Sequence, residues 1–469
     1  MRTKERINVT PFDNGIHLYS MANRLLNLSA IGYRRGSIHD PVGLSGMNHL
    51  VEHMTCRKGT KHTEREVERI MNRFMGGTHG PEINVRCDRT SVLYGHDDMR
   101  RREYMWKCFE MNADLVKSAM LDAYGIGPRV LSVKGLKTEK AAIHNEYRLR
   151  GTDVVEGHVF DLVHWHMYKV NPARRRVDCV LKDLHEINIE QVRQFIRDGC
   201  TTENMFVIFI GPKNNEAVEK VREYFGDLPK RSPVPLAYNH SDDFPKLDRV
   251  HSFELVRTGI RQHHVAIAFP AGPYLSKDSE ALDVLTAIWE YRIERRLREG
   301  NTRFNKGIYH PESFFPRTLT HGMVGAWFAT VGDSEYVEQA IAIAVEECEK
   351  LKVDESMLFN EDCEDRREYL RDAYEQLFLW YPLNLCEAIT EATCNEDLKL
   401  KHFLSYPKRL SLITPKRLRG VARKYFTTPD CFVRVVVKPL IVPQDVIDRA
   451  SDEVRPYLLA INNDPDFSS

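Results

Sequence analysis

The segment that decides the fold of this chain is GLSGMNHLVEHMTCRKGT, residues 43–60. Its apolar residues recur at helical spacing, so we expect one short helix with a packed face. Another face carries His49, Glu52 and His53, which lie within four positions of one another and therefore meet in space. Two imidazoles at i and i+4 can hold one zinc ion, and the carboxylate beside the second can take a proton from a metal-bound water. The pattern alone also fits a surface helix with two solvated histidines.

The composition favours a multidomain protein of the cytoplasm. At 469 residues the chain is too long for one core, and its length suggests about two to four domains. Lysine plus arginine and aspartate plus glutamate both number 67, so the net charge is zero, which argues against nucleic-acid or membrane partners. No apolar run is long enough to cross a membrane, and residues 1–10 lack the apolar core of a signal peptide. The ten cysteines form no Cys-X-X-Cys pair and fit reduced cytoplasmic thiols.

The elements around this helix follow from turn and cap signals. Residues 5–40 read as short strands separated by turns. Thr63 and Glu66 form a capping box that opens a further helix, which we expect to stop at residues 76–77. Residues 82–95 read as a strand.

A helix predicted at residues 138–150 carries two carboxylates on its apolar face. Glu139 and Glu146 stand seven positions apart, with Ala142 and Ile143 between them on the same face. Burying a lone charge is costly, so each carboxylate needs a partner, and a metal ion is one candidate for Glu146. The alternative is that both are partly exposed and pair with arginine or lysine.

The second half of the chain repeats the first. Residues 187–207 align without gaps with residues 413–433, and both segments lead from an apolar helix through a Thr-Thr turn into a strand. The helix predicted at residues 279–298 takes the place of the first helix but has no His-X-X-Glu-His, so only one copy would bind metal. We therefore predict an α+β fold of two homologous domains, each a mixed sheet with helices on one side.

These repeats suggest four parts of the chain. Residues 1–230 would form the zinc-binding catalytic domain. Residues 231–250 would be a linker, because residues 227–235 contain three prolines and few apolar residues and mark its start. Residues 251–440 would form the homologous domain without a zinc motif, and residues 441–469 a C-terminal tail.

From about residue 10 to residue 440, the chain resembles the pitrilysin, insulysin and mitochondrial-processing-peptidase family of zinc proteases, in the short form with one pair of domains per chain. The most specific block is residues 49–54, the inverted zincin motif, followed by residues 58–60. Further matches lie at residues 36–37, 76–77, 90–94, 139–146, 204–205, 225–229 and 297–298.

The resemblance implies that a zinc ion, Zn2+, is held by His49, His53 and Glu146. Glu52 would be the general base, and Glu139 a carboxylate that supports the ligands from behind. The span from His53 to Glu146 is longer than is usual for the family, which leaves Glu139 open as the third ligand.

In the second half, Arg298 and Tyr309 resemble the Arg-Tyr pair that polarises the substrate carbonyl. Residues 299–308 are extra relative to the family, so Arg303 or Lys306 is an alternative to this pair.

The resemblance also implies that this chain is a zinc metalloendopeptidase acting on peptides or unfolded polypeptide segments. Substrate would add as a strand to a sheet edge at residues 82–95, although the sequence near Asn84 departs from the family's Asn-Ala pattern. Two such chains would face each other as halves of a clamshell, in a homodimer or in a heterodimer with a related subunit, with Arg298 and Tyr309 acting in cis or in trans. The alternative is a non-catalytic structural or peptide-binding subunit of the same fold.

Overall fold

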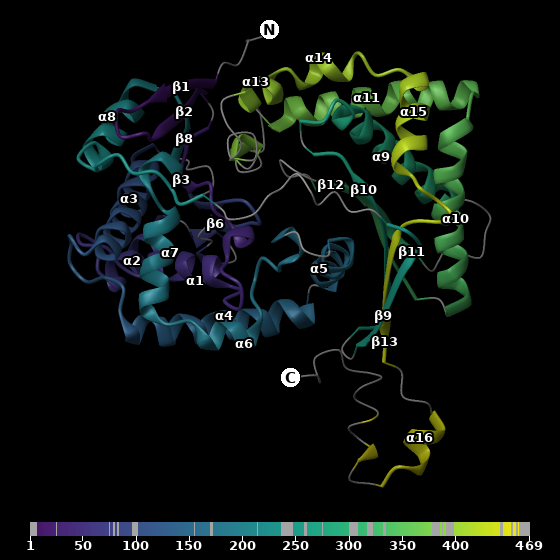
Figure 1. Cartoon of the computed structure of the whole chain (residues 1–469), viewed down its shortest axis with the longest axis horizontal. Helices are drawn as coiled ribbons and strands as arrows, with labels where there is room; N and C mark the ends of the chain where they lie inside the picture. Colours follow the sequence, from purple (N-terminus) through teal and green to yellow (C-terminus); the bar gives the residue numbers. More distant parts are fainter. Residues whose placement is uncertain are drawn as a thin grey trace. The chain divides into compact units, whose positions relative to one another are not determined.

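The computed structural model divides the chain into two compact units (Figure 1). Unit 1 comprises residues 1–145, 175–238 and 375–403, and unit 2 comprises residues 146–174, 239–374 and 404–469. The structure describes residues 7–24, 26–74, 76–77, 80–81, 84–95, 102–153, 155–168, 172–212, 214–235, 247–257, 260–273, 275–299, 308–316, 322–331, 334–377, 385–386, 388–390, 398–440, 444–451, 454–455 and 458.

Unit 1 is built on a six-stranded sheet with the strand order β1-β2-β8-β3-β7-β6. Neighbouring strands are antiparallel except for β2 and β8, which are parallel. The strands are β1 (Ile7–Pro11), β2 (His17–Ala22), β3 (Leu28–Tyr33), β6 (Asn84–Cys87), β7 (Val92–Gly95) and β8 (Met205–Gly211). A separate two-stranded ladder joins β4 (Gly76–Gly77) to β5 (Gly80–Pro81).

The helices α3 and α8 cover one face of this sheet. Helix α3 contacts β3 and β7, α8 contacts β2 and β8, and the two helices contact each other. Trp106 of α3 stacks on Phe209 of β8, and this ring pair lies in the core. The described helices of unit 1 are α1 (Met47–Thr55), α2 (Glu64–Phe74), α3 (Arg102–Tyr124), the first part of α4 (Val133–Asp153), α6 (Leu181–Glu186), α7 (Ile189–Gly199), α8 (Asn214–Phe225) and most of α13 (Leu398–Leu404).

Unit 2 repeats this sheet, with the order β11-β12-β10-β13-β9. Its parallel pair is β9 and β13, and β13 lies between β9 and an antiparallel β10, as β8 lies between β2 and β3. The predicted pair of homologous α+β domains is thereby confirmed. The strands are β9 (His251–Arg257), β10 (His263–Ala271), β11 (Ile308–Phe314), β12 (Gly322–Thr330) and β13 (Val433–Pro439).

The sheet of unit 2 is covered on both faces, and β10 is buried at every position. Val265, Ile267 and Phe269 of β10 join a core with α9, α10 and α15, whereas Ala266 and Ala268 face α5 (Figure 1). The helices are α5 (Val155–Met167), α9 (Ser279–Glu294), α10 (Ser334–Val353), α11 (Met357–Leu377), α14 (Tyr406–Leu410), α15 (Pro415–Tyr425) and α16 (Gln444–Arg449).

The position of α5 corrects the expected domain division. A first domain of residues 1–230 would include this helix, but its apolar face packs on β10 and β13 of the second sheet. Val159 and Val163 are fully buried there because β10 and β13 present small and β-branched residues on that face. Most of the predicted linker, residues 236–246, lies outside the described residues.

Two further expectations concern the elements beside α1. The Thr63–Glu66 capping box is confirmed, since the Thr63 backbone N–H donates to Glu66 Oε2 at 2.8 Å and the Glu66 N–H to Thr63 Oγ1 at 3.4 Å. The single strand predicted at residues 82–95 is wrong, because β6 and β7 form a hairpin there. Asp88 begins its turn, and the Asp88 N–H donates to the Ser91 carbonyl at 2.9 Å.

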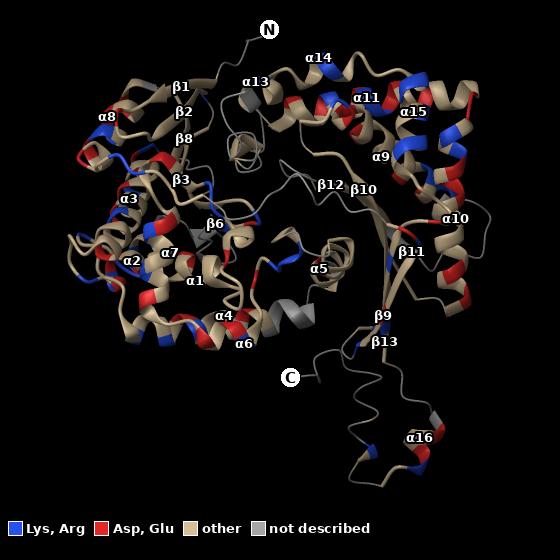
Figure 2. Ribbon diagram, in the orientation of Figure 1, with Lys and Arg blue, Asp and Glu red and all other residues tan. Residues whose placement is uncertain are grey.

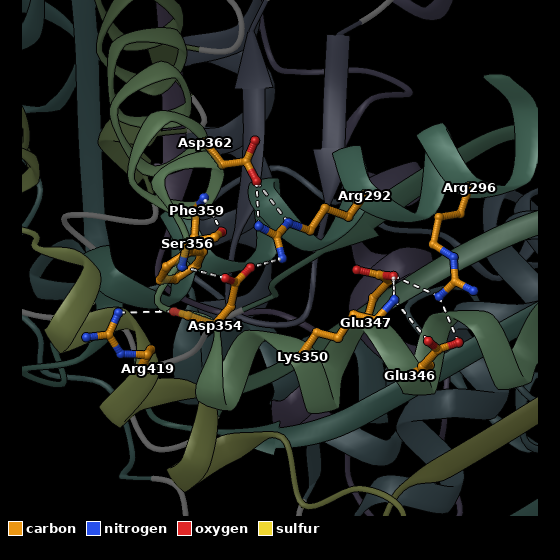
Figure 3. A network of polar contacts seen from close by, with 10 residues as sticks. All are labelled: Arg292, Arg296, Glu346, Glu347, Lys350, Asp354, Ser356, Phe359, Asp362 and Arg419. Carbon is orange, nitrogen blue, oxygen red and sulfur yellow. Dashed lines mark hydrogen bonds and ion pairs between the residues drawn. The ribbon is translucent and has the colours of Figure 1, made fainter. Parts of the chain in front are cut away.

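A network of ion pairs holds α9 against α10 and α11 in unit 2 (Figure 3). The guanidinium of Arg292 donates to Asp354 at 2.9 Å and to the buried Asp362 at 2.7 Å. One turn later, Arg296 pairs with Glu346 and Glu347, each at 2.8 Å. The network therefore fixes the end of α9, where the helix passes into a π-helical turn at Arg295–Glu299.

Charged residues are interspersed over the helices of both units (Figure 2), in keeping with the zero net charge. Within the described part of the chain, no helix is long and apolar enough to span a bilayer.

Candidate metal centre

The start of helix α1 is capped by the side chain of Asp40, which lies outside the helix. Gly46 precedes it in the left-handed region, with φ of +93°, and a Cβ there would lie 2.4 Å from the Cys179 Cβ. The buried carboxylate of Asp40 accepts the backbone N–H groups of Gly46 and Asn48, both at 2.8 Å. Burial raises the pKa of Asp40 to about 7, although these N–H groups and the nearby Arg175 favour the charged form. Asp40 therefore fixes the start of the helix that carries the candidate ligands.

The predicted packed face of α1 is confirmed. Met47, Leu50, Val51 and Met54 are all buried in the core. The opposite face is not solvated either: His49 is 5% exposed and Glu52 is 9% exposed. The burial of His49 contradicts the alternative of a surface helix with two solvated histidines, although the His53 side chain is 22% exposed.

The two histidines turn the same ring nitrogen toward each other. His49 Nε2 lies 3.2 Å from His53 Nε2, and Glu52 Oε2 lies 3.7 Å from His49 Nε2. Two nitrogens bound tetrahedrally to one zinc ion are separated by about 3.3 Å, given Zn–N bonds of about 2.0–2.1 Å. His49, Glu52 and His53 form a group of potential ligands, all within 4.8 Å of one another, among the residues that the structure describes. The spacing of the imidazoles thus fits one zinc ion.

Glu139 lies behind His53, on the side away from this group. Its Oε2 is 3.1 Å from His53 Nδ1, and its Oε1 accepts from Arg57 Nη1 at 2.5 Å. Burial alone would raise the pKa of Glu139, but the hydrogen bonds from His53 and Arg57 outweigh burial and lower it. An ionised Glu139 requires the proton of a neutral His53 to sit on Nδ1, which leaves the Nε2 lone pair directed at His49.

Glu146, the predicted third ligand, belongs to unit 2, whereas the two histidines belong to unit 1. It lies seven residues beyond Glu139 on α4, about 10.5 Å along the helix axis, and is half-buried. Glu139 faces the ring nitrogen of His53 that points away from His49. The carboxylate that completes the site stays a prediction.

Two contacts that the sequence did not predict hold α1 in place. Arg57, just past the end of α1, donates to Glu139 and also to Glu64 at the start of α2, at 2.8 Å. Asn48 Nδ2 lies 2.7 Å from Cys87 Sγ on β6, the edge strand of the sheet. Neither residue belongs to the His-X-X-Glu-His pattern, so spacing along the chain carried no signal for them.

The remaining predicted residues are described only in part. Arg298 lies in the π-helical turn after α9, is exposed, and pairs with Glu294 at 2.9 Å. Tyr309 and Asn84 lie on β11 and β6, but their side chains are outside the described residues, as are Arg303 and Lys306.

Comparison with known proteins points to one family. Residues 186–357 match the model of the peptidase M16 inactive domain. The chain is 23% identical over 241 residues to mitochondrial-processing peptidase subunit beta of Neurospora crassa, covering 50% of this chain and 46% of that one. It is 22% identical over 259 residues to zinc protease PqqE of Helicobacter pylori, covering 55% and 54%. The chain thus spans about half the length of the curated relatives it matches.

Solved structures share the fold over most of the chain. A protease from Helicobacter pylori superimposes with a TM-score of 0.77 at 16% identity, covering 93% of this chain and 100% of that one. A peptidase M16 inactive domain from Pseudomonas fluorescens gives a TM-score of 0.74 at 12% identity, covering 93% and 99%.

Proposed function

We propose that this chain, which is similar to peptidases of the M16 family, is a zinc-dependent endopeptidase. Its substrates would be peptides or unfolded polypeptide segments in the cytoplasm. The observation that carries the proposal is the 3.2 Å separation of His49 Nε2 and His53 Nε2, with Glu52 between them on a buried helix.

Each candidate residue of α1 and α4 would have a separate chemical role. A zinc ion bound by His49 and His53 would supply Lewis acidity to water and to the substrate carbonyl. Glu52, beside the two imidazoles, would accept the proton of the attacking water and pass it to the leaving amine. Glu139 would keep His53 in the tautomer that directs Nε2 at the metal. We propose Glu146 as the third ligand, and Arg298 with Tyr309 as the groups that stabilise the oxyanion.

The label "inactive domain" of the matching model concerns a different part of the chain. The match covers residues 186–357, whereas the candidate ligands and Glu139 precede residue 186. The matched segment contains no His-X-X-Glu-His, as expected for the copy that binds no metal. The label therefore does not weigh against a zinc site on α1.

The proposal extends to a partner chain. The Neurospora crassa relative is named as a subunit, and this chain spans about half its length. We propose a homodimer, or a heterodimer with a related subunit, in which a second chain helps to form the substrate-binding site.

Zinc content and cleavage of a quenched fluorogenic peptide test the proposed function. We expect the purified chain to hold zinc and cleave the peptide, and the Glu52→Gln variant to keep the zinc while cleavage falls at least about 100-fold. Glu68→Gln, an equivalent change at an exposed position of α2, should leave both unchanged.

Two results would contradict the proposal. If Glu52→Gln cleaves as fast as the parent chain, Glu52 is not the general base. If the parent holds zinc but does not cleave with any partner, the chain is a non-catalytic subunit of the same fold.

A further inference from the structure

Arg57 follows helix α1 and binds two carboxylates that come from other helices of unit 1. Its Nη1 donates to Glu139 Oε1 of α4 at 2.5 Å, while Nε and Nη2 both donate to Glu64 Oε1 of α2, at 3.3 and 2.8 Å. A guanidinium group is planar and rigid, so these donors have fixed directions. Arg57 therefore ties the end of the helix that carries the histidines to both α2 and α4.

The two ion pairs of Arg57 differ in their exposure to water. The Glu139 side chain is 13% exposed, whereas the Glu64 side chain is 52% exposed. An exposed ion pair contributes little, and a partly buried pair is screened much less. The contact with Glu139 is thus the stronger of the two.

Helix α4 lies close against the guanidinium of Arg57. A Cβ on Gly135, in the first turn of α4, would lie 3.3 Å from Arg57 Nε and 3.5 Å from its Cδ. The Gly135 N–H donates to Ser132 Oγ at 3.0 Å, so the start of α4 has a cap of its own. A variant without the guanidinium should therefore keep this helix folded.

The two oxygens of Glu139 have separate partners. Oε1 accepts from Arg57, and Oε2 lies 3.1 Å from His53 Nδ1. A glutamate side chain has several rotatable bonds, and a single contact with a histidine ring does not fix all of them. The hydrogen bond from Arg57 to Oε1 holds Oε2 beside Nδ1.

We propose that Arg57 is a positioning residue for the zinc site, which acts through Glu139 on the imidazole of His53. It fixes the carboxylate beside Nδ1, so that a neutral imidazole keeps its proton on Nδ1 and offers Nε2 to a metal ion. This inference rests on the zinc site of the proposed function. It concerns how the site is built and does not depend on peptide cleavage.

The charge of Arg57 and its positioning role affect zinc binding in opposite directions. A cation near the site repels a zinc ion, so removal of the charge alone would tighten binding. Loss of the positioning contact would weaken binding, because partners behind a ligating histidine change metal affinity by about 10- to 100-fold. The direction of the change in an Arg57 variant therefore separates the two effects.

Zinc affinity is measured on the full-length chain by competition with a chromophoric chelator. We expect Arg57→Gln to weaken zinc binding about 5- to 20-fold. The matched control is Lys58→Gln, which removes a half-buried cation one position along the chain. Among the described contacts, Lys58 has no hydrogen bond or ion pair to Glu139, so the control should not weaken binding. Circular dichroism checks that both variants fold.

A double-mutant cycle tests whether Arg57 acts through Glu139. The Glu139→Ala background has no carboxylate to position, so Arg57→Gln should weaken zinc binding there by less than about two-fold. A residue that only held α1 against α2 and α4 would weaken binding equally in both backgrounds.

A second readout needs no metal. Nuclear magnetic resonance of the EDTA-treated chain, with isotope-labelled histidine and at a pH where histidine is neutral, shows which ring nitrogen carries the proton. The His53 signals are identified by their loss in His53→Gln. We expect the Nδ1–H form in the parent chain and in Lys58→Gln, and a shift toward the Nε2–H form in Arg57→Gln.

Three results overturn the inference: unchanged or tighter zinc binding in Arg57→Gln, an equal loss in the Glu139→Ala background, or the same His53 tautomer in Arg57→Gln as in the parent chain. A parent chain that holds zinc but cleaves no peptide would contradict the proposed function and leave this inference standing. If the parent chain binds no zinc, the proposed function fails, and the tautomer in Arg57→Gln still decides this inference.

Discussion

At the scale of single residues, the candidate metal centre depends on Glu139 as much as on the histidines. Its contact with Nδ1 sets the tautomer of His53, and Arg57 holds it from the other side. Glu139→Gln can keep a hydrogen bond to His53 but removes the charge that makes the imidazole a stronger ligand. We expect zinc affinity, measured by competition with a chelator, to fall about 10- to 100-fold.

The control for this prediction is Glu64→Gln. Glu64 shares the Arg57 guanidinium with Glu139 but has no contact with His53 in the described network. Its replacement should change zinc affinity less than about two-fold, because exposed ion pairs contribute little. Equal affinity in Glu139→Gln and the parent chain would show that Glu139 does not tune the site.

The limits of sequence reasoning at the residue scale follow from this pair of carboxylates. His49, Glu52 and His53 could be grouped because side chains three or four positions apart on one helix are neighbours in any fold. Glu139 and Glu146 share one face of α4, and only the path of that helix past α1 decides how each lies relative to His53. The sequence pattern offered a metal ion as one partner for Glu146, but it linked this helix to the histidines through family resemblance alone.

At the scale of elements, α1 depends on Asp40 for its start. In the folded chain the pKa of Asp40 is raised to about 7, whereas an unfolded chain has the ordinary value near 3.8. Between pH 3.8 and about pH 7, the Asp40 carboxyl is ionised in the unfolded chain but protonated in the folded chain. The contribution of Asp40 to the free energy of unfolding is therefore present below about pH 4 and is lost as pH rises to about 7.

The prediction compares the parent chain with Asp40→Asn over pH 4 to 9. The variant cannot ionise, so its stability relative to the parent should rise from pH 4 to 7 by up to about 4 kcal/mol and be constant above pH 7. Thermal unfolding at each pH measures the difference in Tm. A pH-independent difference would mean that Asp40 has an ordinary pKa in the folded chain.

Sequence patterns predicted whether most segments near the site are helices or strands. They did not predict which other elements these segments pack against. The helical period identified α1, and the cap signals identified the start of α2, because both depend on local geometry. The turn between β6 and β7 was missed, since residues 82–95 contain no glycine or proline before Gly95 to mark it. The order of residues along the chain assigned α5 to the first domain, because its apolar residues carried no information on which sheet they would cover.

At the scale of the whole molecule, the internal repeat was the strongest prediction. The aligned segments 187–207 and 413–433 correspond to α7 with β8 and to α15 with β13. Each pair leads into the strand that lies between a parallel and an antiparallel neighbour. Gapless alignment detected the repeat because α7 and α15 have the same length, 11 residues, and each is followed closely by its strand.

The repeat also determines how the proposed catalytic groups are distributed. His49, Glu52 and His53 lie in unit 1, whereas Arg298 and Tyr309 lie in unit 2. In a homodimer, a zinc site could therefore use the Arg-Tyr pair of its own chain or that of its partner. The two arrangements make opposite predictions for a mixed dimer.

The last prediction uses a dimer with one Glu52→Gln subunit and one Arg298→Ala subunit, purified with two different affinity tags. If Arg298 acts in trans, the zinc site of the second subunit meets the intact Arg298 of the first, and one complete site remains. Peptide cleavage should then be about half that of the parent dimer, while each homodimeric variant loses at least about 100-fold. If Arg298 acts in cis, both sites of the mixed dimer are defective and cleavage is as low as in the homodimeric variants. Complete loss of activity in the mixed dimer would therefore contradict the trans arrangement.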